Sequence, residues 1–356
     1  MLKKSVTYFV LLLTLLSCQR KPLYLKAEAA LKINVQVQAD INLLWNVSWR
    51  DSLKYNWDES IHGKIGYTLP DYCNVVVLEK GKLVSENKIQ SNKRELIDIE
   101  LGKTYDLLIY SKELFHVDSY YDDGQYYVET PSTTTRYSMN RISDEYDTVI
   151  QPGEIFAMNK KEVSISDDLS DFEEVVENGK IIYVYNIDEM LEPVSYIYIV
   201  QFIIINDDGS EKIEAKDILN FTISGVSAKK NLFNNEAIYT GNKQIESTDI
   251  LPCQDLGDSL VFASRITILD LLPDVPNSSW SSQLDFLYYS SVDVSTYNYG
   301  EVTGTKDITE ELRKNPKGGV ITVRILNSEL KKGGQSSGVF GIDIGEWKNH
   351  VFNIDC

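Results

Sequence analysis

Residues 33–49 carry the most regular alternation of hydrophobic and polar positions in the chain. Every second residue is apolar from Ile33 to Trp49, and the positions between them are polar except for Leu44. A period of two is the pattern of a β-strand with one buried face. The stretch is longer than most strands, so we expect a bend or bulge within it. Such alternation favours antiparallel β-sandwich structure over a buried parallel sheet.

Shorter strand-like segments follow along the rest of the chain, and turn residues separate them. The expected strands cover residues 74–79, 83–89, 95–101, 104–110, 180–186, 195–206, 218–226, 260–270, 283–291, 319–327 and 338–344. Lys-Gly and Asp-Gly turns between such runs are typical of β-hairpins. Residues 130–147 are polar and predict loops or edge structure, and the one helix we expect covers residues 307–314, capped by Asp307. The pattern therefore predicts an all-β fold.

Length and composition indicate two domains. The chain has 356 residues, with 43% hydrophobic and 25% charged residues, which is the composition of a soluble globular protein. Residues 167–179 are acidic and short of aliphatic side chains, and the strand pattern resumes after them. We therefore predict two tandem antiparallel β-sandwich domains, at residues 31–170 and 171–356.

The N-terminus has the features of an export signal. Two lysines precede an apolar run that ends at Leu16, and this run is too short to cross a bilayer as a helix. Leu-Leu-Ser directly before Cys18 resembles the lipobox of bacterial lipoproteins, in which the cysteine is acylated and becomes the mature N-terminus. The resemblance implies a signal peptide at residues 1–17 and a lipidated spacer at residues 18–30. The alternative is an ordinary signal peptide followed by an incidental cysteine.

The residues after Cys18 favour the outer membrane. Gln19 stands where lipoproteins retained in the inner membrane of well-studied systems carry aspartate. Surface-exported lipoproteins of Bacteroidota tend to have acidic residues there, whereas this chain has Arg20 and Lys21. We therefore expect an outer-membrane protein anchored through Cys18, and its periplasmic or surface orientation stays open.

The net charge of the chain argues against a nucleic acid partner, and the spacing of its cysteines argues against a zinc site. The net charge of −18 repels phosphate backbones, so we expect no nucleic acid partner. Cys73, Cys253 and Cys356 lie far apart and without C-x-x-C spacing, so no zinc site is expected. An exported chain could form one disulfide from these three, and Cys253 with Cys356 is favoured because both lie in the same half of the chain.

Motifs for catalysis are weak. Residues 334–338 match G-x-S-x-G, but a nucleophile elbow needs a strand before the serine and a helix after it, and a strand pattern follows here. No two of His62, His116 and His350 are close in sequence. We therefore assign no catalytic, cofactor-binding or metal-binding residue and expect no enzyme. A carboxylate-dependent hydrolase is the remote alternative in so acidic a chain.

Four tyrosines around one Asp-Gly turn give the strongest indication of a binding surface. Tyr120, Tyr121, Tyr126 and Tyr127 would occupy two faces of one hairpin. Tyrosine combines a flat apolar ring with a hydroxyl group, which suits protein or sugar surfaces. Ordinary strand propensity and cross-strand packing would also explain these residues. The hairpin is our candidate surface for a protein partner or a glycan.

Eight short blocks of the mature chain together carry a family resemblance. They are residues 45–49, 63–67, 105–108, 152–157, 196–198, 223–226, 307–309 and 316–321. These blocks resemble a Bacteroidota lipoprotein family that is labelled a domain of unknown function. That family is similar to the FimB-type anchor subunits of fimbriae, in the fimbrillin-like superfamily, which have a lipidated N-terminus and two transthyretin-like β-sandwich domains.

The resemblance implies a function as well as a fold. We expect a non-catalytic outer-membrane lipoprotein that acts as an anchor, accessory or adhesion subunit related to fimbrial assembly. Its expected partners are the membrane, through Cys18, and fimbrial subunits, and it needs no cofactor. The alternative is a surface lipoprotein that binds glycans.

Overall fold

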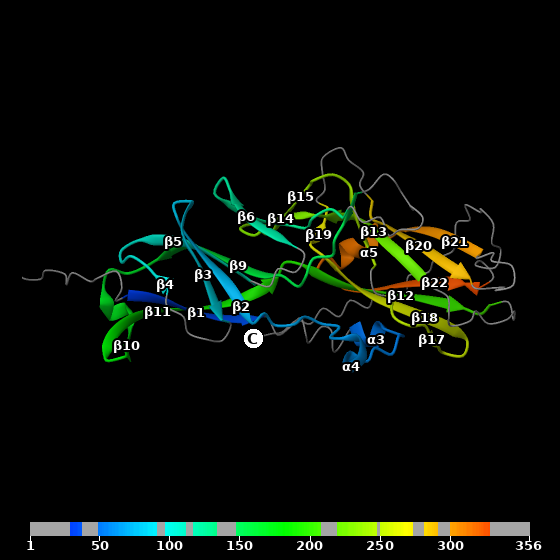
Figure 1. The fold of residues 1–356 in the computed structure, drawn as a ribbon, viewed down its shortest axis with the longest axis horizontal. Coiled ribbons are helices and arrows are strands. Elements are labelled where there is room, and N and C mark those ends of the chain that lie inside the picture. The colour runs from blue at the N-terminus through cyan, green and yellow to red at the C-terminus, as the bar shows by residue number, and fades with distance from the viewer. Residues whose placement is uncertain are drawn as a thin grey trace, which may run out of the picture.

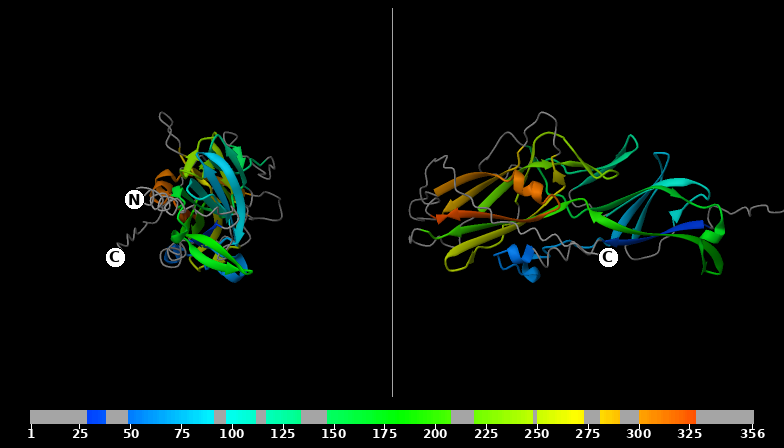
Figure 2. Two further views of the ribbon diagram at one scale, coloured as in Figure 1. Left: turned by 90° about the vertical axis from the view of Figure 1, so that its left-hand side faces the viewer. Right: turned by 180° about the vertical axis from the view of Figure 1, so that it is seen from behind.

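The computed structural model describes residues 29–37, 49–90, 97–111, 117–133, 147–207, 219–247, 250–272, 281–290 and 300–327. Most of these residues form strands, and the sheets follow one another along the axis of an elongated molecule (Figures 1 and 2). The helices of the described residues are short. The expected all-β class is therefore confirmed.

One end of the molecule is an eight-stranded sheet, which we call the first portion. Its strand order is β3-β2-β5-β9-β11-β1-β4, with β10 paired to β11. The strands are β1 (Ala29–Val37), β2 (Tyr72–Glu79), β3 (Lys82–Gln90), β4 (Ile97–Asp98), β5 (Thr104–Ser111), β9 (Phe156–Ser164), β10 (Glu173–Glu177) and β11 (Lys180–Pro193), and a 3₁₀ turn, η2 (Leu169–Asp171), precedes β10. Alternate residues of β2, β5 and β9 form one buried apolar cluster. Strands from before and after residue 170 thus share one sheet.

The other end, which we call the second portion, contains a four-stranded sheet, β17-β18-β12-β22, and a six-stranded sheet, β21-β20-β13-β16-β8, with β19 on β13. The elements are β8 (Asp147–Val149), β12 (Tyr196–Ile205), β13 (Leu219–Ser227), β16 (Lys243–Glu246), β17 (Gln254–Asp255), β18 (Ser259–Ile268), β19 (Asp270–Leu271), β20 (Gln283–Ser290), β21 (Gly300–Asp307), α5 (Thr309–Lys314) and β22 (Gly319–Leu326). The ring centroid of Phe202 lies 5.2 Å from that of Phe221 and 5.8 Å from that of Phe286, so the two sheets enclose a common core.

Strand β12 is buried on both faces, as its nearly continuous apolar sequence requires. Its residues Tyr198, Phe202 and Ile204 face the core of the second portion. On the opposite face, Ile197 and Ile199 join the apolar cluster of the first portion. The hydrophobic core therefore continues from one portion into the other through this strand.

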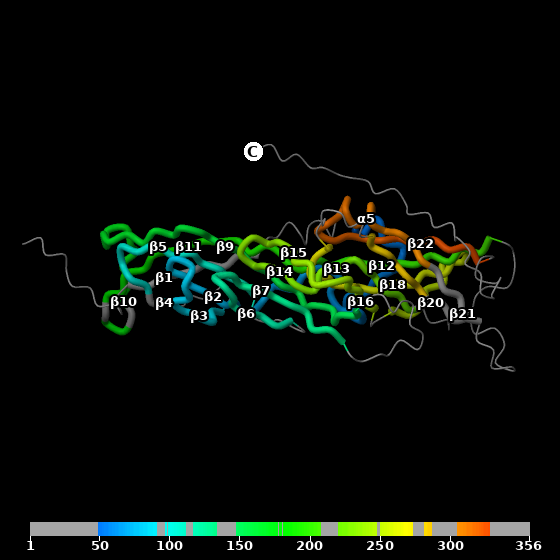
Figure 3. Tube along the Cα trace, turned by 90° about the horizontal axis from the view of Figure 1, so that it is seen from above, coloured from blue at the N-terminus to red at the C-terminus, as the bar shows by residue number. Residues whose placement is uncertain are grey.

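A small third sheet lies between the two ends, with the order β15-β14-β7-β6 (Figures 1 and 3). It pairs the hairpin of β6 (Asp118–Asp122) and β7 (Gln125–Glu129) with the hairpin of β14 (Lys229–Asn231) and β15 (Glu236–Ile238). Val76, Leu108, Tyr126 and Leu232 pack together, so this sheet covers the outer face of β2 and β5. Segments about a hundred residues apart are thereby joined.

The segment after β1 also crosses to the second portion. It contains α3 (Arg50–Ser52) and α4 (Glu59–His62), which lie beneath β18 and β17 in Figure 1. Tyr55 packs against Ile203 and Val261 on the outer face of the four-stranded sheet. The polar residue within β12, Gln201, holds the segment there, because its Oε1 accepts from Lys54 N at 2.8 Å.

Most strands lie where the sequence pattern predicts them, and the sheets are mainly antiparallel, as expected. Three pairs are parallel, namely β1 with β11, β12 with β22 and β8 with β16. Long connections through another sheet make such parallel pairing possible, and the alternation of single strands does not reveal it. Residues 338–344, also predicted to be a strand, lie outside the described residues.

Several predicted element ends differ from the structure. The strand expected at residues 95–101 is reduced to β4, and the strand expected at residues 180–186 continues to Pro193 as β11. Trp49 was expected at the end of a long strand but has helical φ and ψ of −72° and −40° at the N-cap of α3. Its ring is nevertheless buried in the first portion, so the hydrophobic alternation marks burial there and not strand. Helix α5 begins at Thr309, whose N–H donates to Oδ1 of Asp307 at 2.9 Å, so the expected capping residue lies just before the helix.

The predicted domain ranges, 31–170 and 171–356, stay a prediction. Strand pairing shows that the chain passes from the first portion into β12 at Val194 and Ser195. Strands β7 and β8 pair with β14 and β16, which come from the later part of the chain. The two portions are therefore interlocked by several chain crossings.

Candidate functional site

The tyrosine hairpin has the geometry that its sequence predicts. Asp123 and Gly124 have φ of 44° and 76°, which are the two positive values of a type I′ turn. Tyr120 lies opposite Tyr127, and Tyr121 lies opposite Tyr126. The four rings are therefore divided between the two faces of the hairpin, as expected.

The inward pair fastens the hairpin to the first portion. The hydroxyl oxygen of Tyr126 lies 2.9 Å from that of Tyr110, and Tyr126 donates to Oε1 of Glu86 at 3.2 Å. Tyr126 is 4% exposed, and burial raises its pKa. Tyr121 packs against the same cluster and donates to the carbonyl oxygen of Gly81. These two tyrosines are explained by packing.

The outward pair forms an aromatic surface with a lysine. The ring centroids of Tyr120 and Tyr127 lie 5.6 Å apart at an interplanar angle of 35°. Lys229 Nζ lies 5.1 Å from the first centroid and 4.3 Å from the second, which is cation–π geometry. The hydroxyl group of Tyr120 donates to Oε2 of Glu129 at 2.9 Å. A hydrogen bond with Tyr120 also raises the pKa of Lys229.

A recess of about 330 Å³ opens beside this surface, and Tyr120 lines it. Its polar lining comes from Asp118, Glu129, Thr130, Ser132, Thr240 and Lys243. Nζ of Lys243 lies 2.7 Å from Oδ2 of Asp147, and this hydrogen bond holds the pKa of the carboxyl below its usual value. Among the described residues, the buried Oγ1 of Thr240 has no hydrogen-bond partner.

Sequence reasoning identified the tyrosines of this site but missed its other half. Lys229, Thr240 and Lys243 lie more than a hundred residues further along the chain. They reach the hairpin because β14 pairs with β7, and β16 pairs with β8. Local pattern carries no signal for such pairing, so a single sequence could not have revealed them.

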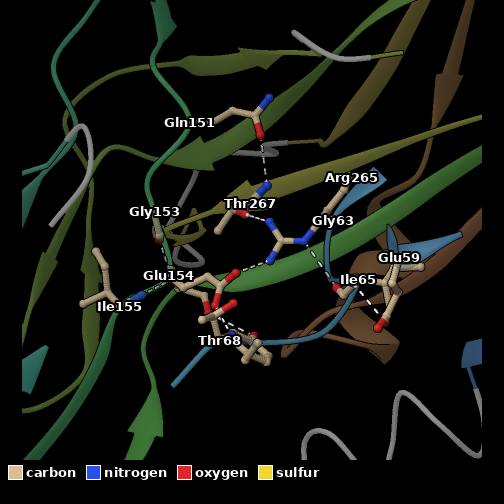
Figure 4. A network of polar contacts seen from close by, with 12 residues as sticks. Glu59, Gly63, Ile65, Thr68, Gln151, Gly153, Glu154, Ile155, Arg265 and Thr267 are labelled. Atoms are coloured by element: carbon tan, nitrogen blue, oxygen red, sulfur yellow. Dashed lines mark hydrogen bonds and ion pairs between the residues drawn. The ribbon is translucent and has the colours of Figure 1, made fainter. Parts of the chain in front are cut away.

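A second polar cluster lies at the junction of the two portions (Figure 4). Arg265 Nη2 lies 2.6 Å from Oε1 of Glu154, its Nε donates to the carbonyl oxygen of Ile65 at 3.2 Å, and its Nη1 donates to Thr267 Oγ1 at 3.2 Å. The other carboxylate oxygen of Glu154 accepts the N–H of Thr68. Arg265 on β18 thereby holds two segments that cross between the portions.

Ser195 and Lys230 complete the junction. The carbonyl oxygen of Ser195 accepts from Tyr67 at 3.1 Å, and its hydroxyl accepts from Ile155 N at 2.8 Å. Fully buried Lys230 donates to the carbonyl oxygen of Val194 at 2.9 Å, and its Nζ lies 2.7 Å from Oδ2 of Asp270. These polar groups are satisfied by one another, so the cluster is a structural joint.

Other sequence candidates lie elsewhere or outside the described residues. Cys18, Cys356 and residues 334–338 are outside them, so lipid attachment and the proposed disulfide stay predictions. Cys73 is buried in the first portion, and Cys253 packs against the core of the second. His62 contacts the rings of Tyr55 and Trp57.

Within the described ranges, no group of three or more histidine, cysteine, aspartate or glutamate side chains is placed to hold a metal ion. No helix of the described part is long and apolar enough to cross a membrane.

No protein-family model and no curated sequence matches the chain. Among solved structures it is similar to a proposed adhesin from Bacteroides ovatus, with 13% identity, a TM-score of 0.47, and coverage of 83% of this chain and 88% of the other. A proposed polysaccharide-binding protein of Bacteroides thetaiotaomicron (DUF1812) has 10% identity, a TM-score of 0.47, and coverage of 90% and 97%.

The fimbrial anchor protein Mfa2 from Porphyromonas gingivalis is also similar, with 11% identity and a TM-score of 0.45 over 90% of this chain and 98% of that protein. The likeness to a fimbrial anchor that the sequence blocks imply is thus found among solved structures.

Proposed function

We propose that the protein is a non-catalytic, lipid-anchored adhesion or fimbrial accessory subunit of the outer membrane. The observation that carries the proposal is the interlocking of the two portions into one elongated body (Figures 1 and 2). A subunit that connects a membrane to an external partner must transmit tension along its length. A single flexible linker between two domains would leave their relative position free.

The connection between the portions suits the transmission of tension, because the chain crosses from one portion to the other several times. The chain crosses the junction in the segments before β2, before β9 and before β12, and Arg265, Ser195 and Lys230 bind these segments to one another. Separating the portions would expose Ile197 and Ile199 and would break the Arg265–Glu154 ion pair. Both changes oppose separation.

The position of β1 fits an anchor at the N-terminus. A chain attached through Cys18 would pull on Ala29 along the axis of β1. This strand has 9 residues, each of them opposite a residue of β11 in parallel register. A pull along the strand loads this hydrogen-bond ladder as a whole and does not open it one bond at a time.

The non-catalytic part of the proposal is supported by how the junction carboxylates are used. Glu154 binds Arg265 and the N–H of Thr68, and Asp270 binds Lys230. Carboxylates held in this way are committed to structure. The adhesin and fimbrial anchor descriptions of the similar solved structures agree with the proposal but do not carry it.

The test compares the full-length protein with its Cys18→Ala variant in a fimbriated Bacteroidota host. We expect the native protein in the outer-membrane fraction, together with fimbrial subunits, and we expect the variant to lose both. Cys253→Ser is the matched control, since it changes another cysteine and leaves the proposed lipid site intact. Membrane association that survives Cys18→Ala would refute the anchor. Native protein that neither captures fimbrial subunits nor supports adhesion would refute the role.

A further inference from the structure

The outward tyrosines, unlike the inward pair, do not attach the hairpin to the first portion. Tyr126 and Tyr121 attach the hairpin to the first portion, whereas Tyr120 and Tyr127 lie on the opposite face beside the recess. An aromatic surface next to a polar recess has two kinds of contact to offer one ligand. We propose that Tyr120, Tyr127 and the recess form a binding site for a neutral saccharide.

The aromatic part fits the apolar face of a sugar ring. A pyranose carries C–H groups on its faces and hydroxyl groups around its edge, so it packs its face on an aromatic ring and directs its edge to polar groups. Tyr120 belongs both to the aromatic pair and to the recess lining. A sugar seated on this ring would therefore present its hydroxyl groups to the recess.

The polar part of the lining offers both hydrogen-bond donors and acceptors. Asp118 and Glu129 accept, Lys243 donates, and the hydroxyl groups of Thr130 and Ser132 do both. One further group is unused, because the buried Oγ1 of Thr240 has no partner within the described residues. A hydroxyl-rich ligand can satisfy such a mixed set, whereas an apolar ligand would leave it unpaired.

The charge of the residues around the recess determines which class of saccharide fits. The site has the carboxylates of Asp118, Glu129 and Asp147 against two ammonium groups, Lys243, which is paired with Asp147, and Lys229, which lies over the two outward rings. The chain as a whole carries −18. This surface repels uronic acids and sulfated sugars, so a neutral ligand is the class that fits.

Size and rigidity agree with this assignment. The volume of about 330 Å³ is at the small end of ligand pockets and suits one or two sugar rings. Asp118 and Tyr120 lie on β6 and Glu129 lies on β7, which are paired strands, and Lys243 lies on β16, which pairs with β8. A site built across paired strands is preorganised, which lowers the entropy lost on binding.

The test is isothermal titration of the detergent-solubilised full-length protein with named probes. The neutral set is cellotriose, maltotriose, mannotriose, tri-N-acetylchitotriose and galactotriose, and the acidic set is trigalacturonate and a sulfated heparin trisaccharide. We expect at least one neutral probe to bind and the acidic probes to bind at least tenfold more weakly. Binding of no probe would overturn the proposal, as would a preference for the acidic set.

Variants of the tyrosines and of Thr240 test whether the saccharide binds at the proposed site. Tyr120→Ala with Tyr127→Ala should weaken the bound probe at least tenfold, whereas the corresponding double Phe variant, which keeps both rings, should lose less. Thr240→Val, which removes only the unused hydroxyl, should also weaken it. Tyr72→Ala is the matched control, because that ring likewise lies under a lysine, 3.6 Å from Lys88 Nζ, but on β2. Binding unaffected by the double Ala variant would overturn the site.

This inference does not depend on the anchor. Fractionation and fimbrial capture test the proposed function without involving the tyrosines, and saccharide titration needs no membrane. Either can therefore fail while the other stands.

Discussion

Arg265 Nη2 lies 2.6 Å from Oε1 of Glu154, and this contact joins β18 of the second portion to the segment that enters β9 of the first. Both side chains are about one-fifth exposed, at 22% and 20%. The pair is therefore partly shielded from water, and each member also holds backbone of the segment that precedes β2. It is the polar centre of the interlocked junction.

Removing one member of this pair should destabilise the whole protein. Arg265→Met and Glu154→Gln should each lower the free energy of unfolding by about 1–3 kcal/mol, less than for a fully buried pair because water screens part of the interaction. The double variant should lose less than the sum of the two. Urea unfolding measures these changes. Lys103→Met, which removes the partly exposed ion pairs with Glu79 and Glu100, is the comparison and should lower the midpoint less.

Gly318 should tolerate no side chain. Its φ is +104°, and a Cβ there would lie 2.3 Å from the carbonyl oxygen of Ile197, at the entry to β12. Gly318→Ala should therefore cost about 2–4 kcal/mol from backbone strain and overpacking. Gly257→Ala is the matched control, because its φ of +96° is similar but nothing lies within 4 Å of the added Cβ. Its cost should be about 1 kcal/mol. Equal losses in thermal unfolding would contradict the close approach at Gly318.

Stability should fall at alkaline pH. Burial raises the pKa values of Tyr67, Tyr110 and Tyr198 above their ordinary value of 10.0. Since the unfolded chain releases these protons first, the stability contribution is full below about pH 10 and is lost as the pH rises toward the folded-state values. Urea midpoints at pH 8 and pH 11 test this, and Tyr110→Phe should make the dependence shallower. A midpoint that does not change would contradict the burial of these hydroxyl groups.

The sequence predicts local features well and long-range pairing poorly. Asp123 and Gly124 specify their own turn, so the tyrosine hairpin and the division of its rings could be foreseen. The continuous apolar run of β12 likewise indicates a strand buried on both faces. These features depend only on residues close together in the chain.

The junction between the two portions could not be foreseen, because its contacts join residues that are far apart in the chain. Trp49 continues the alternation of a strand but lies in a helical turn, because the segment leaves the first sheet to pack on the second portion. The partners of Glu154 and of the outward tyrosines come from strands about a hundred residues away. Nor does the acidic stretch near residue 170 reveal that strands before and after it share one sheet.

The central claim is that the two portions form one interlocked body able to transmit tension from an N-terminal anchor. Differential scanning calorimetry of the full-length protein tests it most directly. We predict one unfolding transition whose calorimetric enthalpy equals its van't Hoff enthalpy, and Arg265→Met should lower the midpoint of that transition without splitting it. Two separate transitions in the native protein, only one of them shifted by Arg265→Met, would show that the portions unfold independently and would contradict the account.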